Sequence, residues 1–168
     1  DIRRRIDTYR VTYRKHTYSI VPHITIYPPF YLKGISKVEL FEKLSTALEP
    51  FPSENMLLDS VAFFENGSDR NVAFFKPDES STTYLRKIFA LCSRCVSGFV
   101  SNKYSDYTAD KEEYTPHLTI SSHISDGLFP QVKRELKNVQ ESFKFTVRSI
   151  DVYEQRANSG IWKKSKEV

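Results

Sequence analysis

Hydrophobic and polar positions along this chain follow two periods, one typical of helices and one typical of strands. The first predicted helix is carried by apolar residues three or four apart, namely Ile2, Ile6, Tyr9 and Tyr13. A strand is predicted over 22–26, where apolar and polar residues alternate. The capping-box pattern Ser36-x-x-Glu39 then predicts the start of a second helix, whose apolar stripe extends to Leu48.

The remainder of the first half is predicted to form a β-hairpin. Apolar runs over 56–64 and 72–75 flank the dipeptide Asn66-Gly67, which is a strong hairpin signal. The second half repeats the order of elements, with a helical stripe over 84–99, a strand over 116–120, a helix over 128–139, strands over 143–147 and 151–153, a turn over 157–160 and a last apolar pair at 161–162.

This repetition predicts the fold class. We expect an α+β protein, a bilobal internal duplication of α-β-α-β-β units with antiparallel sheets flanking a central cleft. The chain would form one domain over 1–168, with lobe one over about 1–78 and lobe two over about 79–168. Ser125 or Asp126 is expected to open the helix over 128–139.

One short signature occurs in both halves. It reads Pro22-His23-Ile24-Thr25-Ile26 in the first and Pro116-His117-Leu118-Thr119-Ile120 in the second. Residues two apart on a strand share a face, so each copy would present an imidazole and a hydroxyl together, with its apolar residues turned to the core.

A single histidine two positions before a hydroxyl residue is a weak signal, and such a histidine is more often structural. His123-Ile124-Ser125 matches this short form but lacks the preceding proline and runs into the turn Asp126-Gly127. The agreement of two longer copies, each in a similar setting, favours a shared site.

Length and composition fit a globular enzyme of one domain. The 168 residues are enough for a substantial core, and no apolar run approaches the roughly 20 residues of a membrane span. We expect a monomer without contact to a membrane. The chain opens on Asp1, and we expect a strand before the first helix to be missing from it.

The net charge of +4 fits an anionic substrate without requiring nucleic acid. Basic residues gather near the start, at Arg3, Arg4, Arg5, Arg10, Arg14 and Lys15. We interpret them as a solvated helix face, with a track for an RNA backbone as the alternative. Cys92 and Cys95 lie within an apolar helical stripe and are expected to pack in the core, and the absence of other cysteines favours a reducing, cytoplasmic location.

Pro22 to Phe30 and Pro116 to Ile120 resemble the two motifs of the 2H phosphoesterase superfamily. The resemblance is closest to the branch of bacterial 2′-5′ RNA ligase and RNA 2′,3′-cyclic phosphodiesterase proteins, and it covers most of the chain. It implies a bilobal fold and catalytic roles for His23, Thr25, His117 and Thr119. The opening strand of the family is not evident before Ile2.

The residue types suit this chemistry. Hydrolysis of a 2′,3′-cyclic phosphate needs a base for water and an acid for the leaving oxygen, and imidazoles titrate near neutral pH. The hydroxyls can donate hydrogen bonds to the non-bridging oxygens as negative charge builds there. We therefore expect a metal-independent phosphodiesterase without a cofactor, acting on RNA ends, cyclic nucleotides or short oligonucleotides, 2′-5′-linked ones included, with reverse 2′-5′ ligation as a possible second reaction.

Further positions follow from strand parity and charge. Tyr27 and Ser121 share parity with the two motifs and are candidates for substrate binding, although Tyr27 is equally suited to covering a strand end. The candidates for phosphate neutralisation are Arg70, Lys76 and Lys103, those for base stacking are Phe63, Phe64, Phe74 and Phe75, and the loop over 101–114 is expected to shape substrate choice. Two alternatives remain open: a catalytically idle module that binds RNA or nucleotides, and a metal site at His23 and His117, although neither motif has an acidic partner or a second histidine at helical spacing.

Overall fold

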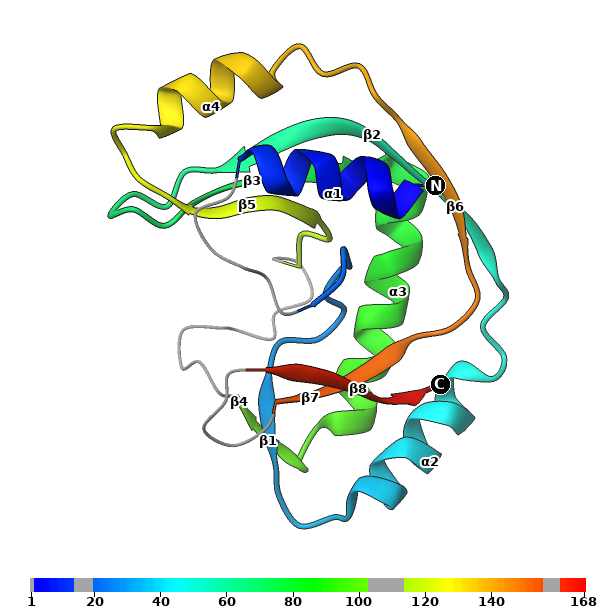
Figure 1. Ribbon diagram of the computed structural model, residues 1–168. Helices are drawn as coiled ribbons and strands as arrows, with labels where there is room; N and C mark the ends of the chain where they lie inside the picture. Colours follow the sequence, from blue (N-terminus) through cyan, green and yellow to red (C-terminus); the bar gives the residue numbers. More distant parts are fainter. Residues whose placement is uncertain (1, 14–19, 103–113, 156–160) are drawn as a thin grey trace. The chain divides into compact units, whose positions relative to one another are not determined.

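The computed structural model describes residues 2–13, 20–102, 114–155 and 161–168 (Figure 1). The helices are α1 (Ile2–Thr12), α2 (Lys37–Leu48), α3 (Glu79–Val96) and α4 (Phe129–Leu136). The strands are β1 (Phe30–Leu32), β2 (Glu54–Phe64), β3 (Asn71–Pro77), β4 (Val100–Asn102), β5 (Leu118–Ile124), β6 (Phe143–Val147), β7 (Asp151–Gln155) and β8 (Trp162–Glu167). The prediction of an α+β fold with antiparallel sheets is confirmed.

The chain divides into two compact units, each built from three separate segments. Unit 1 comprises 1–24, 56–79 and 117–145, and unit 2 comprises 25–55, 80–116 and 146–168. Each unit therefore takes residues from both halves of the chain. This division differs from the continuous lobes over 1–78 and 79–168 that the repeated pattern suggested, because strands from the two halves pair within one sheet.

Unit 1 is organised around the sheet β5-β3-β2-β6. Helix α1 packs against β5, and α4 packs against β3 (Figure 1). The core between them holds fully buried side chains from all of these strands, among them Leu58, Ala73, Phe75, Ile120 and Phe143. Burial of a leucine, isoleucine or phenylalanine side chain stabilises a fold by about 1.5–3 kcal/mol, so this cluster holds β5 in its place.

Unit 2 has its own core between α2, α3 and two short sheets, β1-β4 and β7-β8. Leu40 and Leu44 of α2 and Ile88 and Cys92 of α3 are buried in it. The expected packing of Cys92 is thus observed, and burial raises the pKa of its thiol to about 12, which keeps it protonated and unreactive at neutral pH.

The two helix starts that the sequence predicted have different outcomes. The capping box of α2 is confirmed: the Glu39 amide donates to Ser36 Oγ at 3.2 Å, and the Ser36 amide donates to Glu39 Oε2 at 2.7 Å. The start of α4 is not capped by a Ser125 or Asp126 side chain, because Leu128 occupies the N-cap position without a side-chain hydrogen bond. The Asp126 carboxylate instead accepts a hydrogen bond from Asn71 at 2.7 Å.

Within the described ranges, no helix combines the length and apolarity needed to cross a lipid bilayer. The turn over 157–160, the residues Arg14, Lys15 and Lys103, and most of the loop over 101–114 lie outside the described residues.

Asn71 links the β2–β3 hairpin to the end of β5. Its side chain is 2% exposed and donates to the Ile124 carbonyl at 3.2 Å, and it accepts from the Gly67 amide at 3.2 Å.

Asn71→Leu removes these bonds and leaves buried groups unsatisfied, so we expect a loss of about 2–3 kcal/mol in the free energy of unfolding, measured in urea. Asn66→Ala, which removes one exposed bond from the same hairpin, should cost less than about 1 kcal/mol. Equal losses in the two variants would contradict this role of Asn71.

Candidate active site

The second motif lies at the start of β5, where its neighbours hold it rigidly. Leu118 is 5% exposed and faces the core of unit 1, and Thr119 is half-buried and faces the other side of the sheet. Thr119 lies opposite Phe74 in the β3–β5 register. This alternation is the one that the sequence predicted.

The His117 ring lies against two phenylalanine rings of the hairpin. It meets Phe64 edge to face at a centroid distance of 5.1 Å, and it meets Phe74 at 5.1 Å with a tilt of 55°. Phe64 and Phe74 are themselves 4.4 Å apart. These contacts restrict the rotation of the imidazole and give one side of the site an apolar lining.

The first motif is not a regular strand. Its only described pairing is an isolated antiparallel bridge between Ile24 and Leu118. The predicted strand over 22–26 is therefore wrong, and a physical reason lies in the flanking Pro22, Pro28 and Pro29, which have no backbone N–H to extend a ladder. The predicted alternation nevertheless holds, because Ile24 and Ile26 are half-buried whereas His23 and Thr25 are exposed.

The bridge brings the two motifs together. If antiparallel geometry extends one residue to either side of the Ile24–Leu118 bridge, His23 lies opposite Thr119 and is a diagonal neighbour of His117, at about 7–8 Å. The Ile24 and Leu118 side chains pack on the core of unit 1, and in the same geometry both imidazoles and the Thr119 hydroxyl would share the opposite face. His23 and His117 belong to the same compact unit, and not to separate lobes as expected.

The two imidazoles have different surroundings. Nδ1 of His23 lies 2.8 Å from the Val21 carbonyl oxygen. Although the residue is exposed at the surface, desolvation of its ring lowers the pKa of His23, the nearby Arg10 charge lowers it further, and the Val21 carbonyl opposes both effects. His23 is thus held toward its neutral form at neutral pH.

Thr25 lies in unit 2, directly after the bridge. Its side chain is exposed, and its carbonyl accepts a hydrogen bond from the Tyr114 hydroxyl at 2.9 Å. The Tyr114 ring stacks on the Phe89 ring at a centroid distance of 4.4 Å. The backbone carbonyl of Tyr114 accepts a hydrogen bond from Arg86 Nε at 3.2 Å. Tyr114 therefore holds the backbone of the first motif, a role that no sequence pattern indicated.

Ser121 does not line the site. The β3–β5 register shifts between the pairs Ala73–Ser121 and Phe74–Thr119, so β5 contains one extra residue there. This bulge turns Ser121 to the core face, where it is 2% exposed and donates to the Tyr13 carbonyl at 2.5 Å. The expectation that Ser121 shares the face of His117 and Thr119 is wrong for this reason.

Tyr27 packs into the core of unit 2. Its ring stacks on Phe89 at 6.1 Å and meets Phe30 edge to face at 5.7 Å, and desolvation raises the pKa of its hydroxyl. These contacts are the ones expected of a residue that covers the end of an element.

Of the two described candidates for phosphate neutralisation, Lys76 lies nearer to the second motif. It is exposed and shares the face of Phe74 on β3, and the pairing of Phe75 with Leu118 places it beside His117. Arg70 lies in the hairpin turn, at the other end of β5 from His117. His123 is exposed near that far end and adopts a left-handed backbone conformation with a φ of 56°.

Of the four predicted stacking residues, Phe64 alone is both partly exposed and in contact with His117. Phe75 is fully buried in the core, Phe63 packs edge to face on Phe129, and Phe74 is 2% exposed beneath His117.

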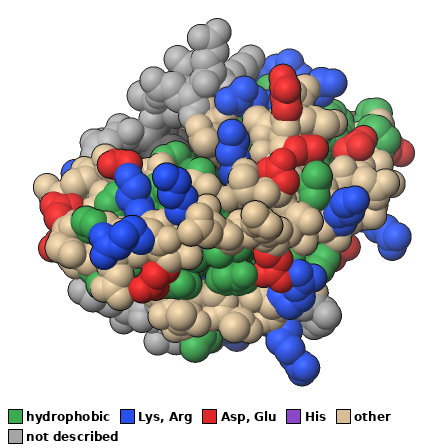
Figure 2. All heavy atoms as spheres, turned by 90° about the horizontal axis from the view of Figure 1, so that it is seen from above, with side chains coloured by type: hydrophobic (Ala, Val, Ile, Leu, Met, Phe, Trp, Pro, Cys, Tyr) green, Lys and Arg blue, Asp and Glu red, His purple; other side chains and the backbone are tan. Residues whose placement is uncertain are grey.

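Three of the described arginines of α1 are paired with carboxylates. Arg3 and Arg10 both pair with Asp7, and Arg5 pairs with Glu141 and lies over the Phe143 ring at 5.0 Å. Figure 2 shows basic and acidic side chains interspersed over the face that it draws. These pairings favour neither a fully solvated helix face nor an RNA track. Arg10 in particular is only 5% exposed, and its spacing from Ile6 on the buried helix face is the signal that could have shown this.

Within the described part of the chain, no three His, Cys, Asp or Glu side chains are placed to bind a metal ion together. The candidate set that the strand register suggests is two imidazoles in unlike surroundings, a hydroxyl opposite one of them and a lysine beside the other. Such a set can move protons on both sides of a phosphoryl group and donate hydrogen bonds to its oxygens.

Comparison with known proteins identifies the family of this chain. Residues 1–159 match the family model described as the 2′-5′ RNA ligase superfamily. A protein of Staphylococcus saprophyticus subsp. saprophyticus with the name "Putative phosphoesterase SSP1770" is 22% identical over 161 residues, which cover 94% of this chain and 86% of that protein. The resemblance drawn from the two motifs is confirmed, and the family is one of enzymes that act on phosphodiester bonds. This chain belongs to the 2′-5′ RNA ligase superfamily of 2H phosphoesterases.

Proposed function

We propose that this protein is a metal-independent phosphodiesterase that opens 2′,3′-cyclic phosphates at RNA ends or on short oligonucleotides. The observation that supports the proposal is the Ile24–Leu118 bridge, around which strand geometry would make the two imidazoles diagonal neighbours on one face. A separation of about 7–8 Å leaves room for one phosphoryl group between two rings that converge on it. RNA is the substrate class that the superfamily name suggests.

The reaction needs two proton transfers. One imidazole takes a proton from water as the water oxygen bonds to phosphorus, and the other gives a proton to the 2′ or 3′ oxygen as its bond to phosphorus breaks. Thr119, opposite His23, would donate a hydrogen bond to a non-bridging oxygen, and Thr25 is proposed for the same role from its equivalent place in the first motif. The same groups acting in reverse would join a 2′,3′-cyclic end to a 5′-hydroxyl, which is a minor reaction in water.

Two further side chains suit an RNA end. Lys76 beside His117 would neutralise part of the phosphate charge, and the partly exposed ring of Phe64 offers a surface on which a base can stack. Ser121 and Tyr27 have no part in this proposal, since each is committed to a core.

The direct test is hydrolysis of a 2′,3′-cyclic nucleotide by the purified protein and its variants. We expect His23→Ala and His117→Ala each to lower kcat by about 10²–10⁴-fold, because each removes one proton-transfer group. His123→Ala, which changes an exposed histidine near the other end of β5, should leave kcat unchanged. Full activity in either motif variant would refute these roles. Measurable binding of a phosphorylated oligonucleotide, without turnover of any substrate, would instead favour the catalytically idle module that binds RNA or nucleotides.

The pH dependence supplies a second test. A base must be neutral to act, and the pKa of His23 lies below the ordinary histidine value of about 6.5. If His23 is the base, kcat/KM should therefore be lost on acidification at a pH below about 6.5, and a second limb at higher pH should report the protonated partner. A profile with only one limb would contradict a pair of titrating imidazoles.

Metal independence is tested separately. We expect activity to be unchanged after dialysis against EDTA, with less than one equivalent of transition metal in the purified protein by elemental analysis. Loss of activity in EDTA and its recovery on adding a divalent ion would contradict proton transfer by the two histidines alone.

A further inference from the structure

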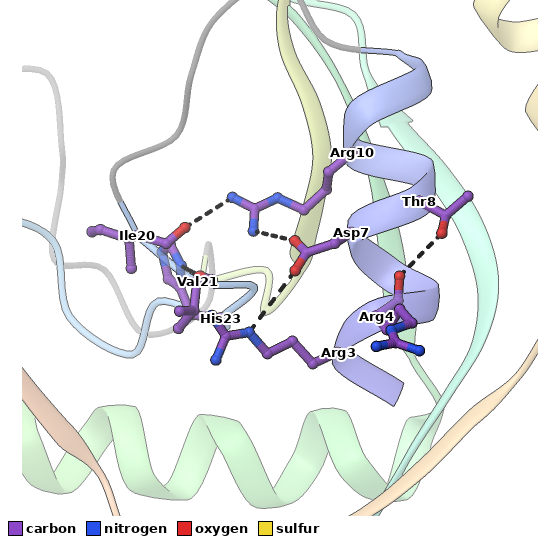
Figure 3. Close-up of polar contacts among 8 residues, drawn as sticks. All are labelled: Arg3, Arg4, Asp7, Thr8, Arg10, Ile20, Val21 and His23. Carbon is purple, nitrogen blue, oxygen red and sulfur yellow. Dashed lines mark hydrogen bonds and ion pairs between the residues drawn. The ribbon is translucent and has the colours of Figure 1, made fainter. Parts of the chain in front are cut away.

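Arg10 is a buried cation next to the site that the proposed reaction does not use directly. It lies on α1 at 5% exposure, and its guanidinium bonds in two directions (Figure 3). Nη1 lies 3.3 Å from Asp7 Oδ1, and Nη2 donates to the Ile20 carbonyl at 3.1 Å. Burial of a charge is costly unless the charge is paired and hydrogen-bonded. The contacts with Asp7 and Ile20 offset this cost and fix the guanidinium in one position.

The Ile20 carbonyl leads directly to the first histidine. Ile20 is followed by Val21, whose carbonyl oxygen lies 2.8 Å from Nδ1 of His23. A carbonyl only accepts hydrogen bonds, so Nδ1 must carry the proton of the neutral ring. Nε2 then holds the free lone pair and is the nitrogen able to accept a proton.

We propose that Arg10 is a positioning residue, which fixes Ile20 and Val21 against α1 so that His23 presents an unprotonated Nε2 as the general base. The inference rests on the proposed function for the reaction itself, and it assigns the roles that the paired motifs leave open. His23 accepts the proton of the attacking water, and His117 donates a proton to the leaving oxygen.

The charges facing His23 agree with this assignment. Helix α1 presents Arg3, Asp7 and Arg10 on the side that faces Ile20, Val21 and His23 (Figure 3). His117 directly precedes β5, next to the bridged Leu118. Asp7 is shared between Arg3 and Arg10, so its negative charge is partly balanced. The net influence of Arg10 is to lower the pKa of His23, in the same direction as desolvation.

Arginine suits this place better than lysine would. Its planar guanidinium offers several donors in a fixed fork, so it can bond the Asp7 carboxylate and the Ile20 carbonyl at the same time. A lysine ammonium carries the same charge on one atom without the fixed fork of donors, so it would hold Ile20 and Val21 less firmly.

The test begins with the unaltered protein and needs no substrate. In a sample labelled with ¹⁵N at histidine, the chemical shifts of the His23 ring above its pKa should show the Nδ1–H tautomer, and its titration should occur below about 6.5. A dominant Nε2–H tautomer would overturn the proposal. Because this measurement is independent of turnover, failure of the proposed function and failure of the positioning role are distinguishable.

Variants then test the arginine itself. We expect Arg10→Gln to populate both tautomers of His23, to move the acidic limb of kcat/KM to higher pH, and to lower kcat about tenfold with KM changed less than twofold. Arg10→Lys should keep the limb near its original pH while lowering kcat severalfold. Arg4→Gln, an exposed position on the same helix, should match the unaltered protein in every measurement.

Two outcomes would overturn the proposal at this stage. One is a folded Arg10→Gln protein with an unchanged His23 tautomer and titration. The other is a variant with a large rise in KM at constant kcat, which would make Arg10 a substrate ligand. If Arg10→Gln does not fold, Arg10→Lys and the tautomer of the unaltered protein decide the question.

Discussion

The site depends on a single backbone bridge between Ile24 and Leu118. An isolated bridge contributes little by itself, since a typical backbone hydrogen bond adds only about 0.5–1.5 kcal/mol to the stability of a fold. Other interactions must hold the two segments in register. Leu118 is anchored in the core of unit 1 with Ile24 packed against it, Asn71 ties the far end of β5 to the hairpin, and Arg10 ties the segment before His23 to α1.

Two similar motifs acquire unlike environments in this arrangement. The His23 ring is hydrogen-bonded to a backbone carbonyl in the vicinity of a buried guanidinium, whereas the His117 ring lies on the faces and edges of two phenylalanines. Acid–base catalysis needs one neutral and one protonated group at the same pH. In the proposed reaction, the difference between the surroundings, and not the motifs themselves, would separate the two roles.

Much of this was predictable from the sequence. The paired signatures identified the family, the alternation around His23 and His117 is observed, and the capping box at Ser36 forms both of its hydrogen bonds. These features depend on local spacing, which a sequence records directly. The roles of the four motif residues stay predictions.

Other features depend on contacts between distant segments and could not be read from local spacing. The bulge that turns Ser121 to the core follows from how β5 pairs with β3, and the two interleaved units follow from which strands meet. Arg10 looked like one more member of a basic cluster, and only its contacts with Asp7 and Ile20 distinguish it from its neighbours.

The most direct measurement of the central claim is a set of nuclear Overhauser effects between the two motifs in solution. The bridge predicts cross-peaks between the backbone protons of Ile24 and Leu118, together with cross-peaks between the side chains of His23 and Thr119. Their presence would establish that the two imidazoles share one face of unit 1. Their absence in the folded protein, with residues 22–26 remote from β5, would contradict the account of the site.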